Sequence, residues 1–364
     1  MKLQKILSVL EDMAPLGYAE DFDNVGLLVG NQNQDISGVL VCHDALENVI
    51  DEAVAKNCNL VVCFHPILFS GIKKITGKNY VERAILKAIK NDVAIYAVHT
   101  AFDNHQKGVN KIFCDALGLI HSKVLIPKEN YIQKLVTFTI AENVEKLRNA
   151  LFEAGAGTIG NYEDCSFNSK GVGTYMGNEN SNPEIGARFE FVEAEETKIE
   201  VTFEKHLQAK ILKALFNNHV YEEVAYELYK LENKHQNIGL GRIGEFENAL
   251  SEKEFLELVQ EKLQCGGIRH SVFTGKPIKK VAVLGGSGSF AIKNAIGSGA
   301  DAYLTADLKY HQFYEAENQL LLADIGHFES ERFTKNYIVD YLKEKITNFA
   351  IILSEENTNP VKYF

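Results

Sequence analysis

The feature that most constrains the fold is a strand, helix, strand pattern near the N-terminus. Residues 37–66, SGVLVCHDALENVIDEAVAKNCNLVVCFHP, pass from a short apolar run through an amphipathic stretch to a second apolar run. Continuous apolar strands joined by a helix are typical of a parallel sheet that is buried on both faces. Residues 80–92 predict a further helix, and residues 93–103 predict a strand that runs into a polar loop. The sequence therefore predicts an α/β fold.

The same plan returns near the C-terminus. Residues 279–311 read as strand, glycine-rich turn, helix and strand, and residues 319–325 as another strand. The apolar spacing of residues 326–346 predicts one amphipathic helix after that strand. Two stretches with the same order of elements predict two related α/β lobes with mainly parallel sheets.

The middle of the chain has a different texture. Residues 131–234 suggest a strand and a helix, a loop-rich segment with many Gly and Asn residues, and then strand, helix and strand. This order is that of a ferredoxin-like β-α-β-β-α-β domain. The predicted domains are an N-terminal α/β lobe at 1–130, an inserted ferredoxin-like domain at 131–234, and a C-terminal α/β lobe at 235–364.

Composition limits the kind of protein. The net charge of −11 disfavours non-specific binding to nucleic acid, which requires many Lys and Arg side chains. No window is long and apolar enough to predict a membrane span. The cysteines are scattered without a CxxC pair, which disfavours a zinc ribbon or a disulfide framework and favours the cytoplasm. They are Cys42, Cys58, Cys63, Cys114, Cys165 and Cys265.

Imidazole and carboxylate side chains follow several predicted strands. His65 ends one strand, His99 and Asp103 follow another, and His327 and Glu331 lie four residues apart at the start of a predicted helix. In an open parallel sheet, ligands bind beyond the carboxyl ends of the strands. Nitrogen and oxygen ligands without thiolate suit a catalytic divalent ion such as zinc, manganese, iron or cobalt. Taken singly, a histidine at a strand end is more often a hydrogen-bonded core residue than a metal ligand. A His/Glu pair four residues apart is likewise more often an exposed surface pair.

Several motifs resemble one known family. They are NLVVCFHPILFSGIKKI, VHTAFDNHQKGVN, HVYEEVAYELYKLEN with NIGLGRIGE, VAVLGGSGS with ADAYLTADLKYH, and ADIGHFESE. In this order they resemble the GTP cyclohydrolase I type 2 homologs, also called the NGG-interacting-factor-three-like family. The resemblance covers nearly the whole chain, and implies a toroidal homohexamer of three dimers with a dinuclear divalent-metal site between the lobes. It also implies that the insert resembles the copper-tolerance type of ferredoxin-like domain.

Carried over to this sequence, the resemblance implies four metal ligands and one departure. The ligands are His65, Asp103, His327 and Glu331, with Glu331 as the bridge between two ions. The family has two adjacent histidines before the proline, whereas this chain has Phe64 before His65. Phenylalanine offers no lone pair, so the second ion is weak or absent unless a neighbour replaces the missing ligand. His43 is the better substitute, because Cys63 and Phe64 point to opposite faces of the strand.

The glycine turn has two interpretations. Gly286, Gly288 and Ala291 match a permissive dinucleotide-binding pattern, with Asp307 about 20 residues further on. NAD binding is one interpretation, although such short patterns often match by chance. The other is that Gly286, Ser287 and Gly288 hold the phosphate of a nucleotide substrate.

The sequence thus supports two main functional hypotheses. The first is a divalent-metal-dependent hydrolase of a nucleotide or pterin-related molecule; by its label the family would open the imidazole ring of GTP and release formate. His99 or Asp44 could then move protons, although Asp44 could equally cap the following helix and His99 could be a core residue. The second is a non-catalytic, metal-binding regulatory ring.

Overall fold

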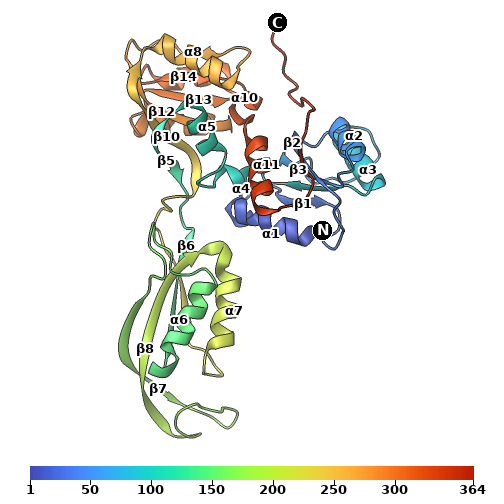
Figure 1. Cartoon of the computed structure of the whole chain (residues 1–364). Helices are drawn as coiled ribbons and strands as arrows, with labels where there is room; N and C mark the ends of the chain where they lie inside the picture. Colours follow the sequence, from blue (N-terminus) through green and yellow to red (C-terminus); the bar gives the residue numbers. More distant parts are fainter. The chain divides into compact units, whose positions relative to one another are not determined.

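The structure is a computed structural model that describes residues 1–364 and consists of two compact units (Figure 1). The first unit combines residues 1–126 with residues 237–364, and the second comprises residues 127–236. The first unit contains one mainly parallel sheet and a second, mixed sheet whose central strands are parallel, which confirms the predicted α/β fold. The division into an N-terminal lobe at 1–130, an insert at 131–234 and a C-terminal lobe at 235–364 stays a prediction.

The first sheet of the first unit has five strands in the order β1-β4-β3-β2-β15. Strands β2, β3, β4 and β15 are parallel, and β1 pairs antiparallel with β4 at one edge. The strands are β1 (Gly26–Val29), β2 (Val39–Asp44), β3 (Leu60–His65), β4 (Ala94–Ala97) and β15 (Ile351–Leu353). Strand β15 therefore brings the C-terminal part of the chain beside β2.

Helices cover both faces of this sheet, as its continuous apolar strands require. Alternate residues such as Val41 and Val62 face α1 and α11, whereas Leu40 and Val61 face α2 and α3. The helices are α1 (Leu3–Met13), α2 (Glu47–Ala55), α3 (Tyr80–Lys90) and α11 (Thr334–Lys345). The strand interiors are consequently closed to solvent, and only their ends remain for chemistry.

The second sheet of the first unit has six strands in the order β11-β14-β13-β12-β10-β5. Its centre, β12 to β14, is parallel, and β10 and β11 add antiparallel pairs. One face packs on α5 and α8 and the other on α9. The elements are β5 (Ile120–Pro127), β10 (Gly239–Leu250), β11 (Arg269–His270), β12 (Ile278–Ser287), β13 (Ala302–Ala306), β14 (Leu321–Asp324), α5 (Val109–Leu117), α8 (Glu252–Leu263) and α9 (Ile292–Gly297).

Two short helices follow strands of these sheets and correct the sequence-based prediction. The segment after β4 was expected to be a loop, but it forms α4 (His99–Asp103). The carboxylate of Asp23 accepts bonds from the backbone N–H and the hydroxyl of Thr100, which stabilises this first turn from a distant part of the chain.

The helix expected over residues 326–346 is divided into α10 (His327–Glu331) and α11. The Ser330 hydroxyl donates to the backbone carbonyl of His327 at 2.7 Å. Back-bonding by serine often bends helices, and this bond lies in the last turn before the interruption. His327 and Glu331 still occupy successive turns of one short helix, as predicted.

The second unit is a four-stranded antiparallel sheet, in the order β7-β8-β6-β9, with two helices. The apolar side chains of α6 and α7 pack on β6 and β8. Strand β7 lies in the segment that the sequence predicts to be loop-rich. The elements are β6 (Ile132–Thr139), α6 (Val144–Glu153), β7 (Phe167–Met176), β8 (Phe191–Glu204), α7 (Gln208–Asn218) and β9 (Tyr226–Lys230). A ferredoxin-like assignment stays a prediction.

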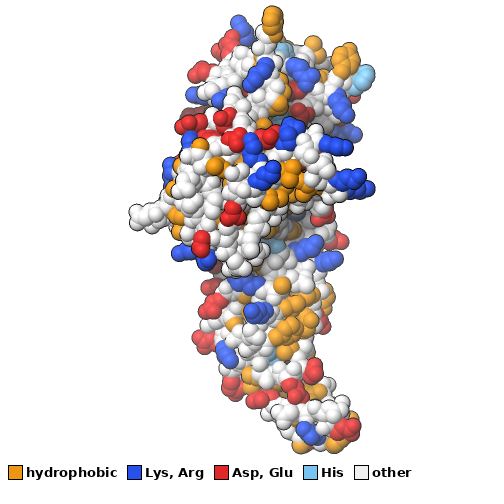
Figure 2. All heavy atoms as spheres, turned by 90° about the vertical axis from the view of Figure 1, so that its right-hand side faces the viewer, with side chains coloured by type: hydrophobic (Ala, Val, Ile, Leu, Met, Phe, Trp, Pro, Cys, Tyr) orange, Lys and Arg blue, Asp and Glu red, His pale blue; other side chains and the backbone are white.

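The face of the molecule in Figure 2 carries acidic and basic side chains that are interspersed, with groups of hydrophobic side chains between them. None of the helices combines the length and the apolar character that crossing a membrane requires.

Candidate metal centre

His65 is held by a carboxylate at the end of its own sheet. The register of the parallel strands places Asp44 of β2 opposite His65 of β3, and the Asp44 Oδ1 lies 2.8 Å from the His65 Nδ1. The other Asp44 oxygen accepts from the Thr358 hydroxyl at 2.5 Å. Because Nδ1 is engaged, His65 presents its Nε2 atom to the second sheet.

His327 is held in the same way from the second sheet. Its Nδ1 lies 2.7 Å from Oδ2 of Asp307, the residue that follows β13. The same carboxylate oxygen accepts from the Ser287 hydroxyl at 2.5 Å. A carboxylate on Nδ1 fixes the ring orientation and leaves Nε2 as the free ligand atom, which is the usual arrangement around metal-binding histidines.

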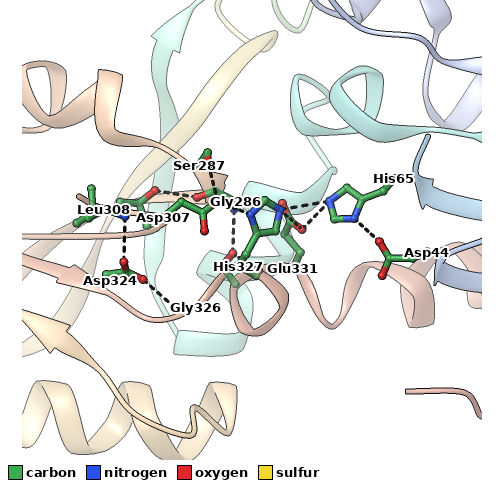
Figure 3. A network of polar contacts seen from close by, with 12 residues as sticks. Asp44, His65, Gly286, Ser287, Asp307, Leu308, Asp324, Gly326, His327 and Glu331 are labelled. Carbon is green, nitrogen blue, oxygen red and sulfur yellow. Dashed lines mark hydrogen bonds and ion pairs between the residues drawn. The ribbon is translucent and has the colours of Figure 1, made fainter. Parts of the chain in front are cut away.

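Glu331 lies where the two histidines meet (Figure 3). Its Oε2 is 3.3 Å from the Nε2 of His65 and 3.3 Å from the Nε2 of His327, and those two nitrogens are 3.3 Å apart. The Glu331 side chain is 4% exposed, and its Oε2 has no hydrogen-bond partner. The three ligand atoms, one of which is this buried oxygen, thus form a triangle with equal edges.

This triangle fits a divalent metal ion. With metal–ligand bonds of about 2.0–2.2 Å, neighbouring ligands of a tetrahedral site lie about 3.3–3.6 Å apart. The three observed distances fall at the lower end of this range, so the triangle has the dimensions of one face of such a site. The side chains of His65 and His327 are 23% and 38% exposed, so the opposite side of the site is open to solvent. The residues present therefore fit an ion with a free coordination position.

The electrostatics of these side chains favour a cation as well. Burial lowers the pKa of His65, but the hydrogen bond to Asp44 and the Glu331 carboxylate outweigh it and raise the pKa to about 9. Burial also opposes charge on His327, yet Glu331 and Asp307 raise its pKa to about 11. Burial would raise the pKa of Glu331, but the nearby His327 holds it well below its usual range. Without metal, protons on the imidazoles supply the positive charge that the carboxylates require.

Asp103, the fourth predicted ligand, lies close to this group without completing it. Its pKa is raised well above the usual range, first by burial and then by the negative charge of Glu331. Its buried Oδ1 has no hydrogen-bond partner. The set of mutually close ligand atoms comprises His65, His327 and Glu331, and Asp103 is not among them. Ligation by Asp103 stays a prediction.

His43 and Phe64 lie on the buried side of the same cluster. The His43 Nε2 is 3.3 Å from the Glu331 Oε2, and the His43 and Phe64 rings stack with centroids 5.4 Å apart. His43, Asp44 and His65 form a second set with ligand atoms within 4.8 Å of one another. Cys63, the poorer substitute, is buried in the hydrophobic core between the sheet and the α2 and α3 helices.

The two predicted proton carriers have different surroundings. His99 borders the cavity described below, and its Nδ1 lies 2.8 Å from Oδ1 of Asp23. Asp44 does not cap α2, because the helix begins after Leu46 without a side-chain cap. Asp44 instead orients His65. Asp23 was missed by sequence reasoning, and no local signal marks it, since it lies 76 residues from His99.

The glycine turn packs against the candidate metal ligands, a contact that the sequence did not reveal. Gly286 has a φ of +68°, and a Cβ there would lie 2.5 Å from the Glu331 Oε1. Its backbone N–H donates to the Ser330 hydroxyl at 2.9 Å. Ser287 donates to Asp307, the residue interpreted from sequence as part of a dinucleotide site. The Gly286 N–H and the Ser287 hydroxyl are thus bonded within the protein. Binding of a dinucleotide at this turn, or of a phosphate by Gly286, Ser287 and Gly288, stays a prediction.

A cavity of about 890 Å³ opens beside the cluster. His65, His99 and His327 border it together with the loop that follows β3. Other lining side chains include aromatic, basic and acidic ones, namely Phe69, Tyr80, Lys73, Lys74, Asp44 and Glu82. A small molecule in this cavity can therefore reach the exposed side of the histidines.

Metal uptake is expected to release protons. At pH 7 the raised pKa values of His65 and His327, about 9 and 11, keep both rings protonated in the metal-free protein. An ion binds only neutral imidazole, so binding releases about two protons and strengthens as the pH rises from 7 toward 9. Titration calorimetry in buffers of different ionisation enthalpy measures this release. Equal heats in all buffers would contradict the protonation states.

The carboxylates that contact the Nδ1 atoms of the histidines are expected to contribute strongly to metal affinity, although they are not ligands themselves. Replacing Asp307 by Asn removes the acceptor that orients His327 Nδ1 and should weaken zinc binding about 10- to 100-fold. Competition with a chromophoric chelator measures the affinity. The control is Asp35→Asn, which changes an exposed carboxylate paired with Lys2. An Asp307→Asn affinity within twofold of wild type would show that His327 needs no such support.

Comparison with known proteins agrees along the whole chain. The sequence model described as Duf34/NIF3 (NGG1p interacting factor 3) matches residues 1–360. A Bacillus subtilis protein named GTP cyclohydrolase 1 type 2 homolog is 37% identical, with 99% of this chain and 98% of that protein covered. A crystal structure of a Bacillus cereus protein related to NIF3 superimposes with a TM-score of 0.85 at 35% identity, covering 100% of this chain and 99% of that one. The motifs, the fold and these relatives agree, and the chain belongs to the Duf34/NIF3 family.

Proposed function

We propose that this protein is a divalent-metal-dependent hydrolase that acts on a nucleotide or a pterin-related small molecule. The observation that carries the proposal is the triangle of His65, His327 and Glu331 ligand atoms beside the cavity. Its nitrogen and oxygen donors suit zinc, manganese, iron or cobalt. Such an ion supplies Lewis acidity and lowers the pKa of a bound water so that it can act as a nucleophile near neutral pH.

The cavity residues supply the remaining functions of a hydrolase. Lys73 and Lys74 provide positive charge for an anionic group such as a phosphate, and Phe69 and Tyr80 provide aromatic surface for a flat ring. His99 has its Nδ1 engaged by Asp23, which leaves Nε2 to exchange a proton with a molecule in the cavity. The relatives named GTP cyclohydrolase 1 type 2 homolog make GTP the first substrate to test.

The oligomeric state and location are part of the same proposal. We infer a homohexamer built as a trimer of dimers, as the family resemblance implies. All six cysteines are free thiols and five of them are buried, which agrees with a reducing cytoplasm. Light scattering of the purified full chain measures the oligomeric state, and a monomeric mass would contradict the hexamer.

The test of the hydrolase is turnover by metal-loaded full-length protein. GTP, other nucleotides and reduced pterin phosphates are incubated with the zinc, manganese, iron and cobalt forms, and products are followed by chromatography and formate release. We expect turnover that His99→Ala lowers at least tenfold without change in metal content. Lys73→Ala with Lys74→Ala should raise KM, whereas the control Lys87→Ala, on α3, should not.

One result would overturn the proposal. Stoichiometric metal binding without turnover of any compound in this panel would contradict the hydrolase and support a non-catalytic, metal-binding regulatory ring.

A further inference from the structure

His43 is a deeply buried histidine that no hydrogen bond satisfies. It is 3% exposed, and neither its Nδ1 nor its Nε2 has a hydrogen-bond partner. Buried imidazole nitrogens are almost always paired, because leaving them unpaired has a large desolvation cost. The exception here lies next to the metal centre, so a missing partner has to be identified.

The Nε2 of His43 lies beside the Glu331 Oε2. The distance from His43 Nε2 is 3.3 Å, the same as the distances from His65 and His327 to that oxygen. Both atoms are buried without hydrogen-bond partners. Two lone-pair donors that face each other at 3.3 Å have the separation of neighbouring ligands on one ion.

The ion that His43 faces differs from the one in the triangle. Ligand atoms on a single ion with bonds near 2.1 Å lie at most about 4.2 Å apart, across its diameter. His65, His327 and Glu331 form one mutually close set, and His43 is not part of it. His43 belongs instead to a set with Asp44 and His65, but the Asp44 Oδ1 and the His65 Nδ1 already form a hydrogen bond of 2.8 Å with each other. Glu331 is therefore the ligand that His43 can share.

The position of Phe64 explains why this nitrogen comes from β2. Register pairs Cys42 with Cys63 and Asp44 with His65, so His43 and Phe64 are side by side on one face of the sheet. The Phe64 ring lies 5.0 Å from the ring of His65 and 5.6 Å from that of His99, centroid to centroid. The Phe64 ring thus packs against imidazole rings, but it has no atom that can bind a metal ion.

We propose that His43 is a ligand of a second divalent ion, which it shares with Glu331 on the buried side of the cluster. The proposal rests on the metal centre proposed above. Glu331 then bridges two ions, and β2 contributes the imidazole that Phe64 on β3 cannot supply. The prediction concerns the number of ions bound, and it holds whether or not the protein turns over a substrate.

The test is the number of cobalt ions bound per chain. Metal-free full-length protein is titrated with Co²⁺, and bound metal is measured by elemental mass spectrometry and by visible absorption, which reports nitrogen and oxygen ligands. Wild type is expected to bind two ions per chain. His43→Leu, which keeps the site apolar and filled, is expected to bind one. His121→Ala, which changes an exposed histidine on β5, is the control and should bind two.

A second variant separates ligand loss from misfolding. Because positions 43 and 64 are adjacent on one face, the double variant His43→Leu with Phe64→His should recover two ions per chain. Two ions in His43→Leu alone, or one ion in wild type, would overturn the proposal. Turnover is measured separately: two ions without turnover leaves this inference standing and removes the hydrolase, and one ion with turnover does the reverse.

Discussion

Glu331→Gln is expected to abolish tight binding of divalent metal. The substitution removes the negative charge from the one oxygen that lies 3.3 Å from three imidazole nitrogens. Loss of an outer carboxylate typically weakens metal affinity 10- to 100-fold, so loss of this ligand should weaken it more than about 100-fold. Elemental mass spectrometry of protein purified without chelator should find less than a tenth of the wild-type metal.

The same variant should also be less stable without metal. The protonated rings of His65 and His327 would then face a neutral amide, which should lower the free energy of unfolding by about 1–3 kcal/mol because both rings are partly exposed. Urea unfolding in the presence of a chelator measures this change.

Glu329→Gln provides the matched control on the same helix. Glu329 is also buried, but its Oε1 accepts from Asn359 rather than facing the histidines. It should keep the wild-type metal content. If Glu331→Gln kept its metal as well, Glu331 would not be a ligand, and both the proposed centre and the role of His43 would fail.

Gly108→Ala is expected to destabilise the first unit by about 3 kcal/mol or more. A Cβ at this position would lie 1.7 Å from the backbone carbonyl oxygen of Phe102, so α4 and the start of α5 have to move apart. Backbone atoms cannot step aside as a flexible side chain can, and overpacking of this kind is among the costly single changes. Urea unfolding followed by circular dichroism measures the loss.

A second glycine shows whether the contact, rather than the residue type, is responsible. Gly297 ends α9, and a Cβ there would meet no atom within 4 Å. Gly297→Ala should leave the protein unchanged or stabilise it by up to about 1 kcal/mol, because alanine favours a helix. Equal destabilisation by both substitutions would contradict the steric explanation.

The sequence predicted the position of the candidate site better than its internal contacts. The carboxyl ends of parallel strands bind ligands, so the sequence predicted that His65 and His327 each lie where chemistry is possible. Their approach was implied only by the family resemblance, because they follow strands of two different sheets. Spacing within one helix predicted that His327 and Glu331 share a face, and that inference needs only local periodicity.

The contacts that orient the ligands were beyond sequence reasoning. Thr358 reaches Asp44 across 314 residues, and Asp23 reaches His99 across 76. Neither pair has a local pattern, since each depends on how separate elements pack. The sequence marked Asp307 as part of a dinucleotide pattern, but it could not show that the carboxylate contacts His327, because an acidic residue after a strand can hold a histidine as well as a ribose.

Strand β15 also affects when the site can form during synthesis. Because β15 pairs with β2 and α11 packs on the same sheet, the five-stranded sheet remains incomplete until residue 353 has left the ribosome. The ribosome makes about 5–20 residues per second, so β2 and β3 wait many seconds for their last neighbour. During that interval the edge of β2 is unpaired and open to other chains. The late return of the chain thus delays completion of the sheet that carries His43 and His65 until β15 has been synthesised.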